Sequence, residues 1–556
     1  MKPSPVEKIK KESRGLRGTI DEGLANDLTG AISDADMQVI KFHGMYLQDD
    51  RDRREERSEK KLERLYSFMV RLRLPGGVLS AEQWKACHHI AGDFSTGVIK
   101  ITTRQTIQLH GLLKSTIKPT LQAFHAANLD SIATCGDINR NVAAASHPCQ
   151  SKLHEEIHGY ASKISERLMP KTRAWYEIWL DEEQLLDKKE EEDPLYEDRY
   201  LPRKFKIGIA IPPNNDVDVL TNDIGLIAIE EEGKLAGFNL AIGGGLSQTH
   251  GNSETYPRLA TVIGFVAAGE PTMKAVYEVL TIQRDHGNRS DRKLARLKYT
   301  VDKLGIDWWK NELENRMGFK LEKERSFVFT ARKDYYGWHK GLNDLWYYTV
   351  FAENGRVTDE GNYLLKSALY EIAETGLCTF RFTSNQNVII ADVKENDKSV
   401  LHNILEKHGV ADKNDNSSAI RLNSMACVAF NTCPLALAEA QRYLPEFLTK
   451  LEPVLEKHGL GEEEIIIRMT GCPNGCARSV AAEIGLVGTA YGRYNLHIGG
   501  DREGKRLNTK FRENIDEAEI LSSLDSLLGN YAKNRNQTET FGDFVYRKKL
   551  YEADQL

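Results

Sequence analysis

The strongest constraint on the fold is an internal repeat, because a duplicated chain must build two related units. GFNLAIGGG at 237–245 recurs as RYNLHIGGD at 493–501, an offset of 256 residues. DIGLIAI at 223–229 recurs as EIGLVGT at 483–489, and Pro213-Asn214 recurs as Pro473-Asn474, both at an offset of 260. Upstream, IKITTRQTIQL at 99–109 is similar to FRFTSNQNVII at 380–390, an offset of 281. Four correspondences in one order predict two copies whose loops differ in length.

Alternating polar and apolar residues predict strands with a basic face in the first copy. Along 99–110 that face carries Lys100, Thr102, Arg104, Thr106, Gln108 and His110. The matching face of the second copy carries Arg381, Thr383, Asn385 and Asn387, so Asn385 stands where Arg104 does. Similar alternation aligns Arg71 with Arg73 in YSFMVRLRLPGG and Lys204 with Lys206 in RKFKIGIAI. Short strands and helices in two related halves indicate an α+β fold.

Four of the eight cysteines lie in one stretch of 50 residues. Cys427, Cys433, Cys472 and Cys476 follow the pattern C-x5-C, then 38 residues, then C-x3-C. Taken alone, four local thiols favour an iron-sulfur cluster and structural zinc about equally, and the absence of C-x2-C hooks shifts the balance modestly toward iron. Their counterparts in the first copy are Asn141, His147, Pro212 and Asp216. Each half therefore keeps a different share of one composite site.

Composition narrows the class of protein. The chain has 556 residues, enough for several domains, and a net charge of −6, which argues weakly against nucleic acid as a partner. It contains no apolar window long enough to cross a membrane and no apolar signal-peptide core, so we expect a cytoplasmic protein. In that reducing compartment clustered cysteines are metal ligands or catalytic groups more often than disulfides.

Together these motifs identify a resemblance. TGCPNGCAR preceded by C-x5-C, with RQTIQLHG, INRNV and LPRKFK upstream, resembles the sirohaem and [4Fe-4S] sulfite and nitrite reductases. RGTIDEGLANDLTG, KFHGMYLQDDRD, RLRLPGG and FGDF favour the NADPH-dependent assimilatory sulfite reductases over the ferredoxin-linked enzymes, which remain the alternative. A non-enzymatic, zinc-stabilised binding protein is a more remote alternative. The resemblance runs from about residue 10 to near residue 550.

The resemblance implies the cofactors and the residues that hold them. Cys427, Cys433, Cys472 and Cys476 would bind the [4Fe-4S] cluster, and the sulfur of Cys476 would also be the axial ligand of the sirohaem iron. Sirohaem carries more carboxylates than an ordinary haem, and the family pattern assigns their recognition to Lys100, Arg104, Gln108, His110, Asn474 and Arg478. Lys100 departs from the arginine expected there. A lysine keeps the positive charge but cannot donate the two parallel hydrogen bonds of a guanidinium group.

The resemblance also implies the reaction and the partner. Six-electron reduction of sulfite to sulfide would use Arg71, Arg140, Lys204 and Lys206 to bind the anion and supply protons. The glycines at 243–245 do not form a G-x-G-x-x-G fingerprint, so no dinucleotide site is expected in this chain. Electrons from NADPH would then arrive through a separate subunit that contains FAD and FMN, which predicts a hetero-oligomer.

The duplication and the resemblance together predict five segments. They are an N-terminal arm (1–65), a first ferredoxin-like half-domain (66–135), a first sirohaem/Fe-S-type domain without cluster ligands (136–335), a second ferredoxin-like half-domain (336–412) and a second sirohaem/Fe-S domain with the cysteines (413–556).

Overall fold

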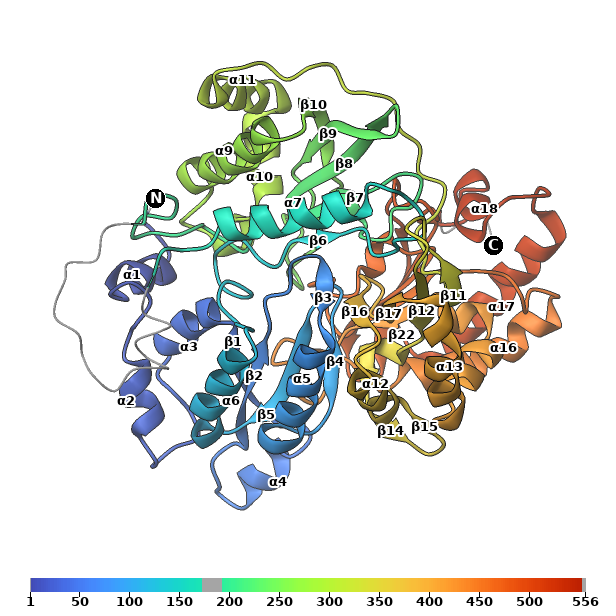
Figure 1. Cartoon of the computed structure of the whole chain (residues 1–556), viewed down its shortest axis with the longest axis horizontal. Helices are drawn as coiled ribbons and strands as arrows, with labels where there is room; N and C mark the ends of the chain where they lie inside the picture. The colour runs from blue at the N-terminus through green and yellow to red at the C-terminus, as the bar shows by residue number, and fades with distance from the viewer. Residues whose placement is uncertain (1, 173–192, 553–556) are drawn as a thin grey trace.

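The computed structural model describes residues 2–172 and 193–552, and it contains the two related halves that the repeat predicts (Figure 1). Each half supplies one antiparallel sheet covered by helices and one mixed sheet. The internally duplicated α+β fold is thus confirmed.

The two antiparallel sheets exchange a strand with each other. The first has the order β1 (Met45–Asp49), β2 (Tyr66–Arg71), β5 (Ile107–Leu112), β4 (Ile99–Ile101), β13 (Arg356–Val357). The second has the order β11 (Gly337–Lys340), β12 (Trp346–Val350), β17 (Val388–Val393), β16 (Thr379–Phe382), β3 (Val78–Leu79). Strand β13 of the second half pairs with β4, and β3 of the first half pairs with β16. The halves therefore cannot separate without breaking both sheets.

Helices hold these two sheets together. They are α5 (Ala81–Phe94) and α6 (Lys114–Ala126) in the first half, and α12 (Leu365–Glu374) and α13 (Lys398–Lys407) in the second. Helix α5 begins at a capping box in which the Ser80 hydroxyl accepts from the Gln83 N–H. Its Trp84 stacks on Phe380 of β16, with the ring centroids 4.9 Å apart. The first half thus packs directly on the sheet of the second.

The two mixed sheets repeat one topology. The first consists of β6 (Ala143–Ala144), β7 (Ile207–Ala210), β8 (Ile224–Glu231), β9 (Lys234–Ile242) and β10 (Thr261–Ala267). The second consists of β18 (Ser424–Ala426), β19 (Ile467–Thr470), β20 (Ile484–Ala490), β21 (Arg493–Ile498) and β22 (Thr509–Ile515). In each sheet the first three strands are parallel and the last two antiparallel.

The remaining elements surround the sheets. In the first half they are α1 (Pro5–Glu12), α2 (Ile20–Ala25), α3 (Asp36–Val39), α4 (Arg54–Glu59), α7 (His154–Arg167), α9 (Glu270–His286), α10 (Leu297–Leu304) and α11 (Ile306–Met317). In the second they are the ribbon β14 (Asp359–Glu360) and β15 (Tyr363–Leu364), then α14 (Val410–Asn416), α15 (Ala419–Leu422), α16 (Leu444–Lys457), α17 (Glu517–Asn534) and α18 (Phe541–Arg547). No helix in the described ranges is long and apolar enough to cross a membrane.

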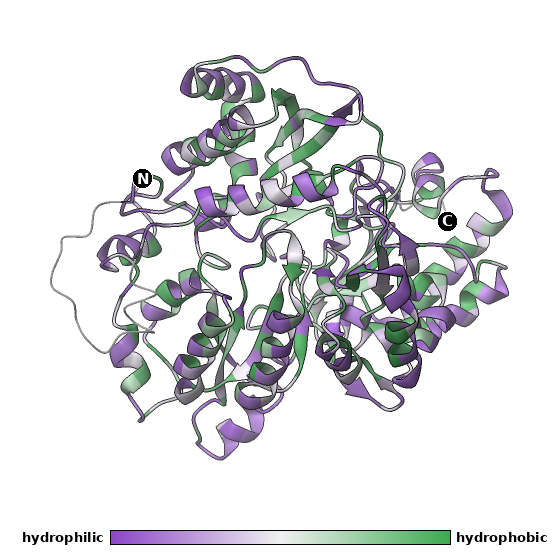
Figure 2. Cartoon of the chain, viewed as in Figure 1, coloured by the Kyte–Doolittle hydropathy of each residue, from purple (hydrophilic) through white to green (hydrophobic). Residues whose placement is uncertain are grey.

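Buried hydrophobic residues form two main cores, and Figure 2 shows hydrophobic residues along the strands of the sheets. One continuous cluster extends from Leu16 to Ala411 and includes both antiparallel sheets. A second extends from Ile420 to Leu550 and belongs to the domain that carries the clustered cysteines. Strand β1, which lies in the segment expected to be an arm, is the edge strand of the first sheet.

The continuous strand predicted along 99–110 is wrong, because the segment is a hairpin. Residues 102–106 form a turn in which the Thr102 N–H donates to the Thr106 carbonyl at 2.9 Å. Gln105 at its tip has a φ of 56°, a left-handed conformation that ends strand geometry. The second copy turns in the same way at Gln386, with a φ of 74°. Arg104 consequently projects from a turn between the domains, whereas Lys100 and Gln108 pair across β4 and β5.

Candidate active site

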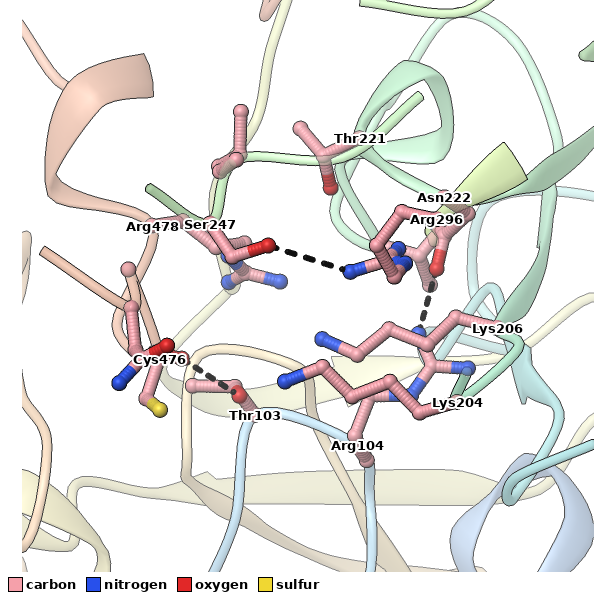
Figure 3. Close-up of a pocket in the computed structure, with 14 residues that line it drawn as sticks. Thr103, Arg104, Lys204, Lys206, Thr221, Asn222, Ser247, Arg296, Cys476 and Arg478 are labelled. Atoms are coloured by element: carbon pink, nitrogen blue, oxygen red, sulfur yellow. Dashed lines mark hydrogen bonds between the residues drawn. The ribbon is translucent and has the colours of Figure 1, made fainter. Parts of the chain in front are cut away.

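A cavity between the two halves collects residues from distant segments (Figure 3). About 440 Å³ of this region is not filled by protein atoms, and part of that space is open to solvent. One wall is the turn 474–478 of the second half, which includes Cys476. The opposite wall is basic, and its members are Arg104, Lys204, Lys206 and Arg296. Predicted metal-binding and substrate-binding residues therefore face one space.

The four clustered cysteines lie around the carboxyl ends of two neighbouring parallel strands. Cys427 follows β18 and Cys472 follows β19, and the Cys427 N–H donates to the carbonyl of Met469 on β19 at 3.2 Å. The Gly471 N–H donates to the Cys427 sulfur at 3.3 Å, and the Asn474 amide donates to the Cys472 sulfur at 3.5 Å. Cys476 is exposed and borders the cavity.

The chemistry of these thiols suits a metal cluster. Burial raises the pKa of Cys427 and Cys472, and raises that of Cys433 to about 11; the charge of nearby Cys476 adds to each shift. Thiolates therefore need a cation to balance them, which bound iron supplies. Within the described residues, no three histidine, cysteine or acidic side chains converge on one metal ion. A four-iron cluster does not require such convergence, because each cysteine binds a different iron.

The basic wall is short of negative charge. Burial lowers the pKa of Lys204 to about 7, helped by Arg203 and Arg296, and burial together with Lys204 lowers the pKa of Lys206 well below its usual value. Figure 3 shows both amino groups reaching into the cavity toward the turn that carries Cys476. A polycarboxylate bound in the cavity would stabilise the charged form of these lysines. The donor set therefore fits sirohaem.

Arg104 and Arg478 border the cavity while also holding its walls together. Arg104 donates to the Asn222 side chain at 2.6 Å and to the carbonyl oxygens of Asn141 and Ile207 at 2.6 and 2.7 Å. Burial lowers its pKa to about 9, with a contribution from Arg478. The Thr103 hydroxyl donates to the Cys476 carbonyl at 3.0 Å, so the β4–β5 turn touches the cysteine turn directly.

The other predicted residues form a polar row beside the cavity rather than its lining. Arg71, Gln108 and Lys100 are cross-strand neighbours on β2, β5 and β4. The Lys100 amino group donates to the Asn354 carbonyl, and the charge of Cys427 acts on it. His110, at the end of the row, contacts Gln48 through Nδ1 at 3.0 Å.

Arg140 connects the polar row to the basic wall. It donates to the Thr134 carbonyl at 2.9 Å, and Arg71 reaches the same oxygen at 3.4 Å. Its charge also helps to lower the pKa of Lys204. Arg73, by contrast, is bound to Asp130 at 2.7 and 3.0 Å and has a structural role.

Sequence reasoning missed several lining residues. Arg296 lines the cavity, is buried, and forms an ion pair with Asp223 at 2.7 Å. Lys298 donates to the carbonyl oxygens of Gly245 and Ser247 at 3.0 and 2.8 Å, which holds the loop beside the cavity. Arg296 and Lys298 have the same two-residue spacing as Lys204 and Lys206. That spacing could have identified them from the sequence.

A second cavity lies at the equivalent place of the other half, and its charges are paired. It is lined by Arg332, Lys333, Asp334, Tyr336, Asn385, Leu422, Asn423, Ser424, Met425, Ile466 and Arg468. By the offset of 260, Glu464 and Ile466 stand where the first half has Lys204 and Lys206. Lys333 forms an ion pair with Glu464 at 2.7 Å. Arg332 and Arg468 are paired with Asp218, so the cations of this lining have carboxylate partners, and the lining contains no cysteine.

The chain matches two protein-family models. The nitrite/sulfite reductase ferredoxin-like half domain matches residues 61–127 and 339–408, and the nitrite and sulphite reductase 4Fe-4S domain matches residues 159–321. The second match lies in the first copy, whereas the clustered cysteines lie in the second, as expected if both copies descend from one domain.

Full-length relatives agree with the models. The sulfite reductase [NADPH] hemoprotein beta-component of Leptospira biflexa is 59% identical over 546 residues, which cover 98% of each chain. The protein of the same name from Bacillus subtilis is 51% identical over 99% of this chain and 96% of its own. The Mycobacterium tuberculosis NirA structure aligns with a TM-score of 0.79 at 25% identity, covering 98% of this chain and 97% of that one.

The chain belongs to the nitrite and sulfite reductase family, an oxidoreductase family built on sirohaem and a [4Fe-4S] cluster. Within it, the chain is a member of the hemoprotein beta-components of NADPH sulfite reductase. These findings confirm the predicted family and both predicted cofactors, and the alternative of a zinc-stabilised binding protein is wrong.

Proposed function

We propose that this chain reduces sulfite to sulfide by six electrons, which reach it from NADPH through a partner that contains FAD and FMN. The observation that carries the proposal is the cavity in which the turn of Cys476 faces Lys204, Lys206 and Arg104. When bound there, the coupled sirohaem and cluster supply the electrons and the iron that takes the sulfur atom of the substrate.

Cys427, Cys433, Cys472 and Cys476 would hold the cluster, with Cys476 shared with the sirohaem. Arg104, Asn474 and Arg478 line the same cavity and would meet the carboxylates. Lys100, Gln108 and His110 would support them from the polar row. The Lys100 contact with Asn354 and its position near Cys427 favour a role close to the cluster.

Lys204 and Lys206 would bind the sulfite oxygens and donate protons as each S–O bond breaks. A lysine whose pKa is about 7 can both carry a charge and release a proton near neutral pH, which is what an acid catalyst needs. Arg71 and Arg140, linked through Thr134, would add fixed positive charge behind them.

The electron route requires a partner protein. The glycines at 243–245 have a structural role: a Cβ at Gly244 would lie 2.3 Å from the Leu220 carbonyl and 2.4 Å from that of Asn222. They permit a close backbone approach after β9 and do not open a helix, as a dinucleotide fingerprint would. A hydride from NADPH must be divided into single electrons, which a flavin does. We therefore propose a hetero-oligomer, assembled in a reducing cytoplasm.

The test uses the purified chain loaded with sirohaem and cluster. We expect sulfide production with reduced methyl viologen and none with NADPH, and we expect NADPH-driven production once the flavoprotein is added. Sulfite-dependent oxidation of NADPH by the chain alone would contradict the proposed route. Restoration by reduced ferredoxin and not by the flavoprotein would favour the ferredoxin-linked alternative.

A further inference from the structure

A buried aspartate of the first half is joined to the cysteine turn of the second. Asp218 is inaccessible to solvent. Its carboxylate forms ion pairs with Arg332 and Arg468 at 2.7 Å and with Arg478 at 2.8 Å. A single carboxylate thus serves three guanidinium groups, so each depends on it strongly.

Asp218 and Arg478 occupy the same position in the two copies. They are 260 residues apart, the offset that also relates Pro213 to Pro473. Each directly precedes a single 3₁₀ turn, 219–221 or 479–481, and each has a left-handed backbone, with φ of 48° and 58°. The ion pair therefore joins one copy to the other at matching points, although nothing in the repeated sequence shows that these residues meet.

Arg478 transmits this contact to the turn. Its Nη2 donates to the Ser384 carbonyl at 2.7 Å and to the Asn385 side chain at 3.1 Å, which fixes the guanidinium from the other side. Its backbone N–H donates to the Gly475 carbonyl at 3.0 Å and closes the turn on which Cys476 lies. The same residue lines the cavity. Asp218 does not line the cavity itself, so a change there would alter the cavity through Arg478.

We propose that Asp218 is a positioning residue for the cofactor site: through Arg478 it fixes the turn of Cys472 and Cys476, and its charge offsets the arginines behind that turn. The inference rests on the proposed function, since it assumes that the turn carries the cofactors.

The negative charge of Asp218 allows the proposal to be tested by measuring redox potentials. Replacing the carboxylate by an amide makes the surroundings of the turn more positive, which favours the reduced, more negative state of a redox group. It also leaves three buried guanidinium groups without their shared partner. We expect Asp218→Asn to lower the sirohaem content per chain severalfold, and to raise the midpoint potential of the cluster in the loaded fraction.

Two further variants separate positioning from general destabilisation. Glu483→Gln is the matched control, because Glu483, in the domain of the cysteine turn, is equally buried but accepts mainly from the backbone N–H groups of Ile466 and Gly542, at 3.0 Å each, with one distant arginine, Arg502, at 3.7 Å. It should lower the melting temperature and leave the potential of the loaded fraction unchanged. Asp218→Glu keeps the charge, so its potential should match the wild type, while its longer side chain should lower the sirohaem content.

The measurements are absorption, acid-labile sulfide, electron paramagnetic resonance and redox titration. Wild-type potential and cofactor content in Asp218→Asn would overturn the proposal. If Asp218→Asn yields no folded protein, Asp218→Glu decides: normal cofactor content and spectra there would overturn it as well. Failure of the wild type to take up either cofactor would contradict the proposed function instead, so the two failures can be distinguished.

Discussion

The two equivalent cavities of this molecule differ in how their charges are satisfied. In the first, Lys204 and Lys206 face the turn of Cys476, and among residues 2–172 and 193–552 neither lysine has a carboxylate partner. In the second, Glu464 takes the place of Lys204 and is bound to Lys333, and Asp216 takes the place of Cys476. A fold can thus be duplicated while only one copy of its site keeps the unpaired charge that attracts an anionic cofactor.

The largest effect is expected from Cys476, the thiol that distinguishes the first cavity from the second. Cys476→Ser should remove the normal signals of both cofactors, because one sulfur is proposed to bind each. Asp216→Asn, the change at the equivalent position, should leave both signals intact. Absorption and electron paramagnetic resonance spectra of the purified proteins check this. An unchanged haem band in Cys476→Ser would remove the shared-ligand assignment.

A large but selective effect is expected from the basic wall. Lys204→Met or Lys206→Met should lower sulfite turnover roughly 100-fold, the usual loss when a positioned proton donor is removed. Sirohaem should stay bound. Lys333→Met, which removes the cation of the second cavity, should not change turnover. Activity with reduced methyl viologen, normalised to sirohaem content, is the measurement, and full activity in both lysine variants would show that the substrate pocket is elsewhere.

A smaller effect on cofactor binding is expected at the β4–β5 turn. Arg104→Ala removes a cation and three hydrogen bonds from the cavity wall, so sirohaem occupancy should fall. Asn385→Ala at the equivalent turn should reduce occupancy less, since Asn385 contacts the site only through Arg478. The ratio of sirohaem to protein measures both. Equal occupancy in the two variants would contradict the assignment of Arg104.

The smallest effect is a pH dependence. The pKa of Lys204 is about 7, below its ordinary 10.5, so the charge that binds sulfite is present at low pH and lost as pH rises through the folded-state pKa. A bound anion raises that pKa, which places the change above pH 7. The KM for sulfite should therefore rise on the alkaline side, and the rise should be weaker in Lys204→Met. Parallel pH profiles for the two proteins would rule out Lys204 as the titrating group.

The sequence predicted the repeated architecture because long, periodic strands leave a repeated pattern. The cysteine site was proposed from the clustering of four thiols within 50 residues and from the family resemblance, and the structure places Cys427 and Cys472 after neighbouring strands. The sequence could not predict the exchange of β3 and β13, since two-residue strands have no periodicity and their partners lie more than 250 residues away. The hairpin at 102–106 was missed because its polar residues happen to keep the alternation of a strand.

The ion-pair network of Asp218 was also beyond sequence reasoning. An isolated aspartate with no repeat partner of the same type gives no signal, and its three arginines come from residues 332, 468 and 478. Arg296 was missed although its spacing from Lys298 is the same as that of Lys204 from Lys206. Comparing the sequences of the two copies does not reveal residues that form contacts between the copies.

The strand exchange has a consequence for how the protein is made. The Thr103–Cys476 contact and both exchanged strands join residues from the two halves, so the cavity has no complete wall while the second half is still being synthesised. Helix α18 must also fold against Gly500, where a Cβ at Gly542 would lie 1.8 Å from the carbonyl oxygen. We therefore expect the cofactors to enter only after both halves of the chain have been synthesised.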